Sequence, residues 1–444
     1  MALELDDIQG LVLGAYPKLP WARYLVLRID EPGATRAWLG SLADDVATAE
    51  TSRPPSARNV AVSFAGLARL GLPPDALGSF PWALRQGMVT EYRSRLLGDR
   101  GASAPQRWCW GAPGAEPDVL LASYAATAGE LLDASALDGC GLAVTATIDS
   151  LLLPYSLEHF GFTDGVSQPV LGGTPRAART EAHRWEVVEP GEFVLGYPDE
   201  SGLRAEGPTV GADRSSSVLP PVPGDARRRD LGRNGSYLVV RQLAQDVVGF
   251  RRYVEDNQRL SAEMVGRWPN GAPLALAPDQ PVEAFSSAND FGYEDDKHGL
   301  RCPLGAHIRR ANPRNSTSKA DTKAEEISRR SANRHRILRR GRPYGSTDLE
   351  VAEERGLFFL ALNADIERQF EFVQHTWLNN PTFAGLSGEV DPLTGDQPDS
   401  GGSFTEPALP VRRRHRGLPS FVTTRGGGYF FLPGLRALRW IGSL

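Results

Sequence analysis

The chain has 444 residues, of which 41% are hydrophobic and 23% charged, the composition of a globular protein with room for two or three domains. Its 49 basic and 54 acidic residues give a formal net charge of -5, which argues against nucleic acid as the main partner. No apolar run approaches the roughly 18 residues that would span a membrane.

The cysteines and the first residues of the chain further restrict the kinds of metal site and the cellular compartment to be expected. Cys109, Cys140 and Cys302 stand in no CxxC or CxxCH spacing, which excludes a thiolate zinc site of the common spacing and covalent c-type haem attachment. So few cysteines fit a reducing compartment. The first residues, MALELDDIQG, lack the apolar stretch of a secretory signal. We therefore expect a cytoplasmic protein.

Residues 1–170 show the element order β-α-β-β-α-β. This order is typical of a ferredoxin-like sheet, and it predicts a first domain of that kind. In chain order, the predicted elements are a strand at 22–30, a helix at 34–48, a strand at 58–63, helical residues at 64–97, a strand at 118–124, a helix at 126–138 and a strand at 141–149.

The segment 171–234 is rich in Gly, Pro, Arg and Ser, as in LPPVPGDARRRDLGRNG, and we expect a long loop or linker there. Residues 235–444 then repeat the first pattern, which predicts a second ferredoxin-like domain and an α+β tandem with antiparallel sheets. Residues 260–334 form an insertion within it. The predicted elements of this half are strands at 236–243, 335–340, 356–363 and 427–432, with helices at 245–257 and 365–378.

Three segments carry residues suited to catalysis. In GFTDGVSQP, Asp164 stands between two glycines, with Phe162 in the motif and Phe160 just before it, which indicates a carboxylate held close to a ligand in a partly apolar pocket. The alternative is an ordinary Asp-Gly turn. In CPLGAHIRRANPR stands His307, and no HxxxH or HExxH pair accompanies it. A single histidine is usually structural, but as a metal ligand it favours haem, because the porphyrin supplies the other four ligands.

The third segment is ILRRGRPYG, in which Arg339 comes just before a turn marked by Gly341 and Pro343. Arginines at such a strand end can point into a cavity, although a solvated basic face is the alternative. An imidazole, a carboxylate and a guanidinium are what a haem peroxidase needs: an iron ligand, a proton carrier and a charge beside the breaking O–O bond.

With these motifs the chain resembles the dye-decolorising peroxidases, haem enzymes with a tandem ferredoxin-like fold. GFTDG resembles the GxxDG motif of the family, CPLGAHIRRANPR its proximal-histidine segment and LRRGRPYG its distal-arginine segment. Similarity also covers DIQGLVLGAYPK, NGSYLVVRQL, NADIERQFEFVQHTWLNN and TTRGGGYFFLPGLRALR, and it is greatest to the longer members with large central insertions.

The resemblance implies roles for individual residues. It implies catalytic roles for Asp164 and Arg339, with His307 as the axial ligand of a non-covalent haem b bound in the C-terminal half. The residues that it places around the haem are Asp391 as partner of the histidine, Leu357 and Phe359 as apolar walls, and Arg309 beside a propionate. For bulky reductants, it implies electron transfer through the surface aromatics Trp377 and Tyr344, for which ordinary packing is the alternative.

We therefore expect an enzyme that reduces hydrogen peroxide and oxidises dyes and phenolics in one-electron steps. Its partners would be peroxide and small-molecule reductants, with neither nucleic acid nor a membrane. Two alternatives use the same cofactor: a haem-binding or delivery protein with little turnover, and a haem-dependent biosynthetic oxidase that acts on a metabolite.

Overall fold

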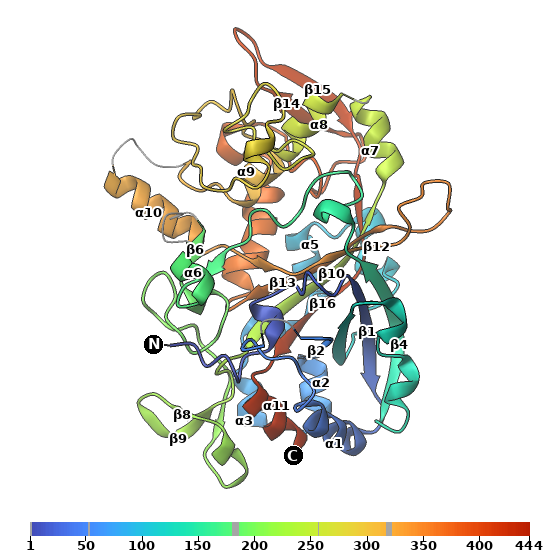
Figure 1. The fold of residues 1–444 in the computed structure, drawn as a ribbon, viewed down its shortest axis with the longest axis vertical. Coiled ribbons are helices and arrows are strands. Elements are labelled where there is room, and N and C mark those ends of the chain that lie inside the picture. Colours follow the sequence, from blue (N-terminus) through green and yellow to red (C-terminus); the bar gives the residue numbers. More distant parts are fainter. Residues whose placement is uncertain (1, 52–53, 180–185, 256, 317–321) are drawn as a thin grey trace.

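The computed structural model describes residues 2–51, 54–179, 186–255, 257–316 and 322–444. Its N-terminal half contains an antiparallel sheet in the order β4-β1-β3-β2, with helices between the strands (Figure 1). This is the strand order of a ferredoxin-like unit, as predicted. The strands are β1 (Trp21–Ile29), β2 (Ala57–Ser63), β3 (Val119–Ala125) and β4 (Leu142–Leu151). The helices are α1 (Pro32–Leu42), α2 (Phe64–Arg69), α3 (Pro74–Gly78), α4 (Trp82–Gln86) and α5 (Glu91–Leu97).

The C-terminal half repeats this order with its own strands. Here β16 and β13 flank β10, and two short strands, β11 and β12, pair with the other edge of β13. Both halves are therefore α+β units with antiparallel sheets. The strands are β10 (Ser236–Gln245), β11 (Leu338–Arg339), β12 (Arg342–Tyr344), β13 (Gly356–Asn363) and β16 (Val422–Leu432), and the helices that follow β10 and β16 are α7 (Val247–Val254) and α11 (Leu435–Gly442).

The two sheets are joined into one ring of strands. β16 pairs with β2 through Phe430–Ser63, and β12 pairs with β4 through Tyr344–Ser150. Tyr24 of β1 stacks on Phe358 of β13 with ring centroids 4.3 Å apart, although these strands are not neighbours in the ring. The inward-facing residues thus form one shared core, while the other face of each sheet packs against helices. The domain boundaries at 170 and 234 stay a prediction.

The region expected to be a linker is more ordered than its composition indicates. It contains a parallel pair, β5 (Val170–Leu171) with β6 (Val187–Val188), followed by a three-stranded sheet of β7 (Thr209–Gly211), β9 (Asp225–Asp230) and β8 (Pro221–Val222). A short helix, α6, spans Pro175–Arg179. Phe193, Val194 and Leu195 are fully buried. This segment therefore contributes to the core instead of only connecting two domains.

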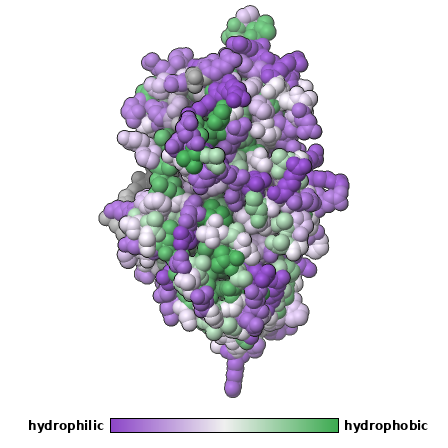
Figure 2. Space-filling view, turned by 90° about the vertical axis from the view of Figure 1, so that its right-hand side faces the viewer, coloured by the Kyte–Doolittle hydropathy of each residue, from purple (hydrophilic) through white to green (hydrophobic). Residues whose placement is uncertain are grey.

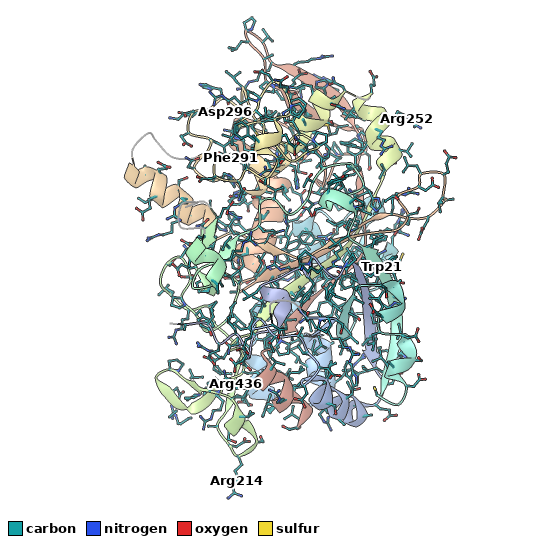
Figure 3. All side chains as sticks on the ribbon, viewed as in Figure 1. Trp21, Arg214, Arg252, Phe291, Asp296 and Arg436 are labelled. Carbon is teal, nitrogen blue, oxygen red and sulfur yellow. The ribbon has the colours of Figure 1, made fainter. Side chains whose placement is uncertain are left out.

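The insertion after β10 and α7 lies above the ring of strands in Figure 1. Much of it is irregular, with α8 (Gln258–Val265), α9 (His307–Ala311) and α10 (Thr322–Asn333) as its helices. The hairpin of β14 (Gly402–Glu406) and β15 (Arg413–Leu418) lies at the same end. Figure 3 shows Phe291 and Asp296 among the loops around α9, far from Trp21 at the start of β1.

Three predicted elements differ from the structure. The helix expected at 126–138 is two 3-10 turns, Ala128–Glu130 and Ala134–Leu137, because the side chains of Thr127 and Asp133 each cap a separate turn. The strand expected at 335–340 shrinks to β11. The predicted helix at 365–378 forms, but as the π-helical turns Glu367–Glu371 and Val373–Leu378.

Most of the face seen in Figure 2 is hydrophilic, with apolar side chains gathered in patches near its middle. Within the described residues, no helix has the length and apolar character needed to cross a membrane.

Two arginines of the motif ILRRGRPYG bind the N-terminal segment to the C-terminal sheet. Arg340 donates to the carbonyls of Leu11 and Val12 at 2.8 and 2.7 Å. Arg342 is fully buried above the ring of Tyr124, 4.7 Å from its centroid. The guanidinium of Arg342 donates to four carbonyls, those of Ala15, Tyr16, Leu19 and Pro20.

Replacing Arg342 by Leu should lower the free energy of unfolding by roughly 3 kcal/mol or more, since each buried carbonyl left without a donor costs about 1–3 kcal/mol. Arg58→Leu is the matched control, because it removes only an exposed ion pair with Asp45. Urea unfolding of both variants checks this. Equal urea midpoints for the two variants would show that the hydrogen bonds from Arg342 to the N-terminal segment do not stabilise the protein.

Candidate active site

A cavity of about 700 Å³ lies between the outer face of the C-terminal sheet and the insertion. Its volume is typical of a site for a small molecule or cofactor. Three of its lining residues are the ones predicted to carry the chemistry, Asp164, His307 and Arg339. The walls come mainly from the segments 97–103, 158–167 and 393–399, from β10, β13, β16 and α9, and from the π-helical turns at 367–378.

The loop around Asp164 turns at two glycines. Gly161 and Gly165 have φ values of +96° and +83°, a region that favours glycine over residues with a Cβ. Phe160 and Phe162 line the cavity on the same loop, as the sequence predicts. Asp164 is thus presented beside an apolar wall, with its Oδ1 accepting the N–H of Gly165 at 2.7 Å.

Arg339 reaches the same carboxylate from the end of β11. Its Nη2 donates to Oδ1 of Asp164 at 3.1 Å, although the two residues are 175 positions apart in the chain. The backbone N–H of Arg339 donates to Oε1 of Gln168 at 3.0 Å. Both side-chain contacts of Asp164 end on Oδ1, so Oδ2 is the oxygen that can meet a small molecule in the cavity.

His307 is the first residue of α9, and neighbouring arginines fix this short helix. Arg310 is fully buried and donates to the carbonyls of Gly305, Trp377, Asn380 and Glu389. Arg309 is held on another side by Asp296 and by the carbonyl of Cys302. This five-residue helix is therefore held in place by side-chain hydrogen bonds of its arginines.

Asp391 orients the imidazole of His307. Its Oδ2 is 2.9 Å from Nδ1 of His307, and its Oδ1 accepts the N–H groups of Leu393 and Thr394. Burial acts to raise the pKa of Asp391, but the charge and hydrogen bond of His307, with the N–H of Thr394, hold that pKa below its usual value. Because Nδ1 is engaged, Nε2 is the ring nitrogen that can bind a metal.

Leu357 and Phe359 lie on β13, and both line the cavity as predicted. They are two residues apart, so their side chains leave the strand on the same face. Arg241 of β10 stands opposite Phe359 in the register and also lines the cavity. An apolar wall results, next to an arginine whose guanidinium is paired with the buried Asp99.

The structure does not support the expected role of Arg309. This residue is 2% exposed and is not among those that line the cavity. Its guanidinium lies over the ring of Tyr293, 4.4 Å from the centroid, and its N–H groups are used by Asp296 and Cys302. The arginine of this region that lines the cavity is Arg267, whose pKa is lowered to about 10 by burial and by the nearby Arg314.

The two aromatics expected at the surface occupy different environments. Trp377 is partly exposed and packs edge-on against Phe372 and His335, with centroids 5.3 and 5.2 Å apart. Tyr344 is 7% exposed and packs in the core inside the ring of strands. Its hydroxyl donates to Glu354 at 3.0 Å. The expectation of a surface position is therefore wrong for Tyr344.

Sequence reasoning missed Glu158, which lines the cavity beside the Asp164 loop. Its carboxylate accepts the backbone N–H groups of Phe160 and Phe162, both at 2.9 Å, and the amide of Gln245 at 2.7 Å. Burial raises the pKa of Glu158, partly offset by these three hydrogen bonds. Nothing in its sequence neighbourhood marks this role, because the partners are main-chain groups and a residue of β10.

Known proteins are similar to this chain over its whole length. A family model described as Dyp-type peroxidase, C-terminal, matches residues 214–410. The dye-decolorizing peroxidase msp1 of Mycetinis scorodonius is 30% identical over 494 residues, which cover 100% of this chain and 88% of that protein. The chain belongs to the dye-decolorizing peroxidase family. It is thus a haem peroxidase, an oxidoreductase that uses peroxide.

Other members agree with this assignment. The multifunctional dye peroxidase DyP2 of an Amycolatopsis species is 33% identical to this peroxidase over 318 residues, 64% of this chain and 60% of that one. The crystal structure of a fungal DyP-type peroxidase from Auricularia auricula-judae matches with a TM-score of 0.81 at 24% identity and covers 100% of both chains. The tandem ferredoxin-like fold of the peroxidase is therefore that of its family.

Glu158→Ala should loosen the loop that carries Asp164. Removing a charged acceptor that serves three donors should destabilise the loop by roughly 2 kcal/mol or more. We expect faster hydrogen exchange at the amides of Phe160 and Phe162, while Glu158→Gln, which keeps one acceptor oxygen, should show a smaller change. Unchanged exchange in Glu158→Ala would show that other contacts hold the loop.

Proposed function

We propose that this peroxidase binds a non-covalent haem b in the cavity, with His307 as the iron ligand, and oxidises dyes and phenolic compounds in one-electron steps. The observation that carries the proposal is the meeting of an imidazole, a carboxylate and a guanidinium in one partly apolar cavity. A haem-delivery protein would have no use for the Asp164–Arg339 pair, so a catalytic role explains the presence of this pair better.

The residues of the cavity fit a haem. A single imidazole suffices because the porphyrin provides the remaining equatorial ligands. The propionates require cationic partners, and Arg100, Arg241 and Arg267 line the cavity in addition to Arg339. When bound, haem takes up the oxidising equivalents of peroxide and passes them on one at a time to reductants.

His307 and Asp391 would act on the proximal side. A carboxylate that accepts the second N–H of a metal-bound imidazole fixes its orientation and makes it a more basic ligand. The 2.9 Å contact between Nδ1 and Asp391 supports this role. The hydrogen bonds from Leu393 and Thr394 to Asp391 would keep the carboxylate aligned.

Asp164 and Arg339 would act on peroxide. Through Oδ2, Asp164 would take the proton from one peroxide oxygen and return it to the other, the work of a general acid–base. Arg339 would stabilise the negative charge that grows on the leaving oxygen. Leu357 and Phe359 would limit water around both residues.

Reductants too large for the cavity need another route. We propose Trp377 as their contact, because its ring is partly exposed and the neighbouring Leu378 lines the cavity. We also propose that the protein works in the cytoplasm, since Cys109, Cys140 and Cys302 are all free thiols.

The test of the ligand is the haem content of purified variants. His307→Ala should lose most of its haem and its Soret absorption, because His307 is the one histidine of the described residues that lines the cavity. His375→Ala is the matched control, since His375 is exposed and should keep the parent spectrum. A normal Soret spectrum in His307→Ala would assign the ligand to another histidine.

We expect Arg339→Leu to slow the reaction with peroxide at least as much as Asp164→Asn. Losing Arg339 removes a charge worth ~10²–10³-fold and also the donor that holds Asp164. Asp164→Asn removes acid–base help worth ~10²–10⁴-fold, but it leaves the charge, and water can carry part of the proton transfer.

Stopped-flow mixing with peroxide, followed at the Soret band, shows which of the two variants reacts more slowly. Arg58→Leu is the control, because Arg58 is not among the residues that line the cavity and removing it breaks only an exposed ion pair with Asp45. If Arg339→Leu reacts at the parent rate while Asp164→Asn does not, Arg339 has only a structural role.

A further inference from the structure

Tyr429 of β16 is a buried phenol close to the cavity. In the register, Arg241 pairs with Phe359 and Gly427, and Val239 pairs with Ala361 and Tyr429. Partners in register share a face, so Tyr429 faces the same side as the cavity-lining Phe359 and Arg241, about 7 Å further along the strands. It is 3% exposed.

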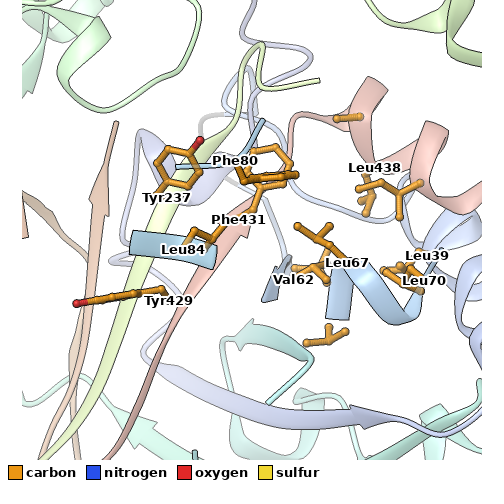
Figure 4. Packing of buried hydrophobic residues seen from close by; sticks show 14 of the residues in the cluster. Leu39, Val62, Leu67, Leu70, Phe80, Leu84, Tyr237, Tyr429, Phe431 and Leu438 are labelled. Atoms are coloured by element: carbon orange, nitrogen blue, oxygen red, sulfur yellow. The ribbon is translucent and has the colours of Figure 1, made fainter. Parts of the chain in front are cut away.

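One aromatic ring connects Tyr429 to the cavity. Phe370 lines the cavity, and its ring centroid is 6.1 Å from that of Phe359 and 6.4 Å from that of Tyr429. Figure 4 shows Tyr429 at the edge of the packed apolar cluster, with its hydroxyl directed away from the leucines. The phenol is therefore one side chain away from a group bound in the cavity.

The hydroxyl of Tyr429 has a carboxylate partner. It donates to Oε1 of Glu371 at 2.8 Å, within the range for direct proton transfer. Glu371 is itself buried and paired with Arg93, which also binds Glu367 at 3.0 Å. Because the side chain of Glu367 is half-exposed, the series Tyr429, Glu371, Arg93 and Glu367 leads from the buried phenol to the surface.

We propose that Tyr429 is a redox-active tyrosine, with Glu371 as its proton acceptor. The proposal rests on haem occupying the cavity. Tyr429 gives one electron to the haem after peroxide has oxidised it, and the hydroxyl proton moves to the carboxylate of Glu371. A neutral tyrosyl radical remains. A reductant later returns the electron, and Glu371 returns the proton.

A carboxylate partner, together with a position next to a cavity-lining ring, separates Tyr429 from the other buried tyrosines. A phenol that loses an electron becomes strongly acidic, so oxidation is easy only where a base can take the proton. Tyr237 is equally buried, but its hydroxyl has no hydrogen-bond partner among the described residues. Tyr344 has Glu354 as a partner, but it lies inside the ring of strands and does not line the cavity.

The experiment is electron paramagnetic resonance of the haem-loaded protein, frozen after mixing with peroxide without a reductant. The parent should give a radical signal that narrows when the protein contains ring-deuterated tyrosine. Tyr429→Phe keeps the ring and should lose most of this signal while its Soret spectrum and its rate with peroxide stay at parent values. Glu371→Gln should give a weaker signal.

Tyr237→Phe and Tyr344→Phe are the controls, and both should keep the parent signal. The proposal is wrong if Tyr429→Phe retains the signal, if Tyr237→Phe loses it equally, or if the parent reacts with peroxide and yields no tyrosyl radical. A parent that binds no haem or does not react with peroxide would instead contradict the proposed function.

Discussion

Buried main-chain carbonyls must find donors, and around this cavity buried arginines supply them. The insertion and the N-terminal segment have little regular structure, so few of their carbonyls are satisfied within helices or strands. Arg310 and Arg342 each bind four carbonyls, and Arg314 binds those of Asn289 and Phe291. The planar, five-donor guanidinium suits this task, which a lysine could not perform. The position of α9, and with it His307, depends on these contacts.

Arginines only a few positions apart in the chain therefore have two different roles. In ILRRGRPYG, Arg339 points into the cavity, while Arg340 and Arg342 turn to the backbone of the N-terminal segment. In HIRR, both arginines are structural, while His307 and Ile308 line the cavity. A cluster of arginines is thus weak grounds for an anion site until the partner of each guanidinium is known.

Much of the fold and the site follows from local signals. Short runs of apolar residues predict the strands of both halves, and the two glycines of GFTDG predict the sharp turn that presents Asp164. Arg309 could not be placed in this way, because its direction depends on the phase of a five-residue helix and on Asp296. Glu158 escaped notice because its partners are mostly backbone groups, and the face of Tyr344 depends on which short strand it joins.

The ring of strands has a consequence for the order in which the protein is made. β2 is complete by residue 63, but its outer neighbour, β16, begins only at Val422. On a ribosome that synthesises from the N-terminus, the end of β2 at Val62 and Ser63 therefore waits through most of translation for its partners Phe431 and Phe430. A strand edge left unpaired is a template for pairing with other chains. The nascent protein can therefore mispair at this end of β2 until its last strand emerges.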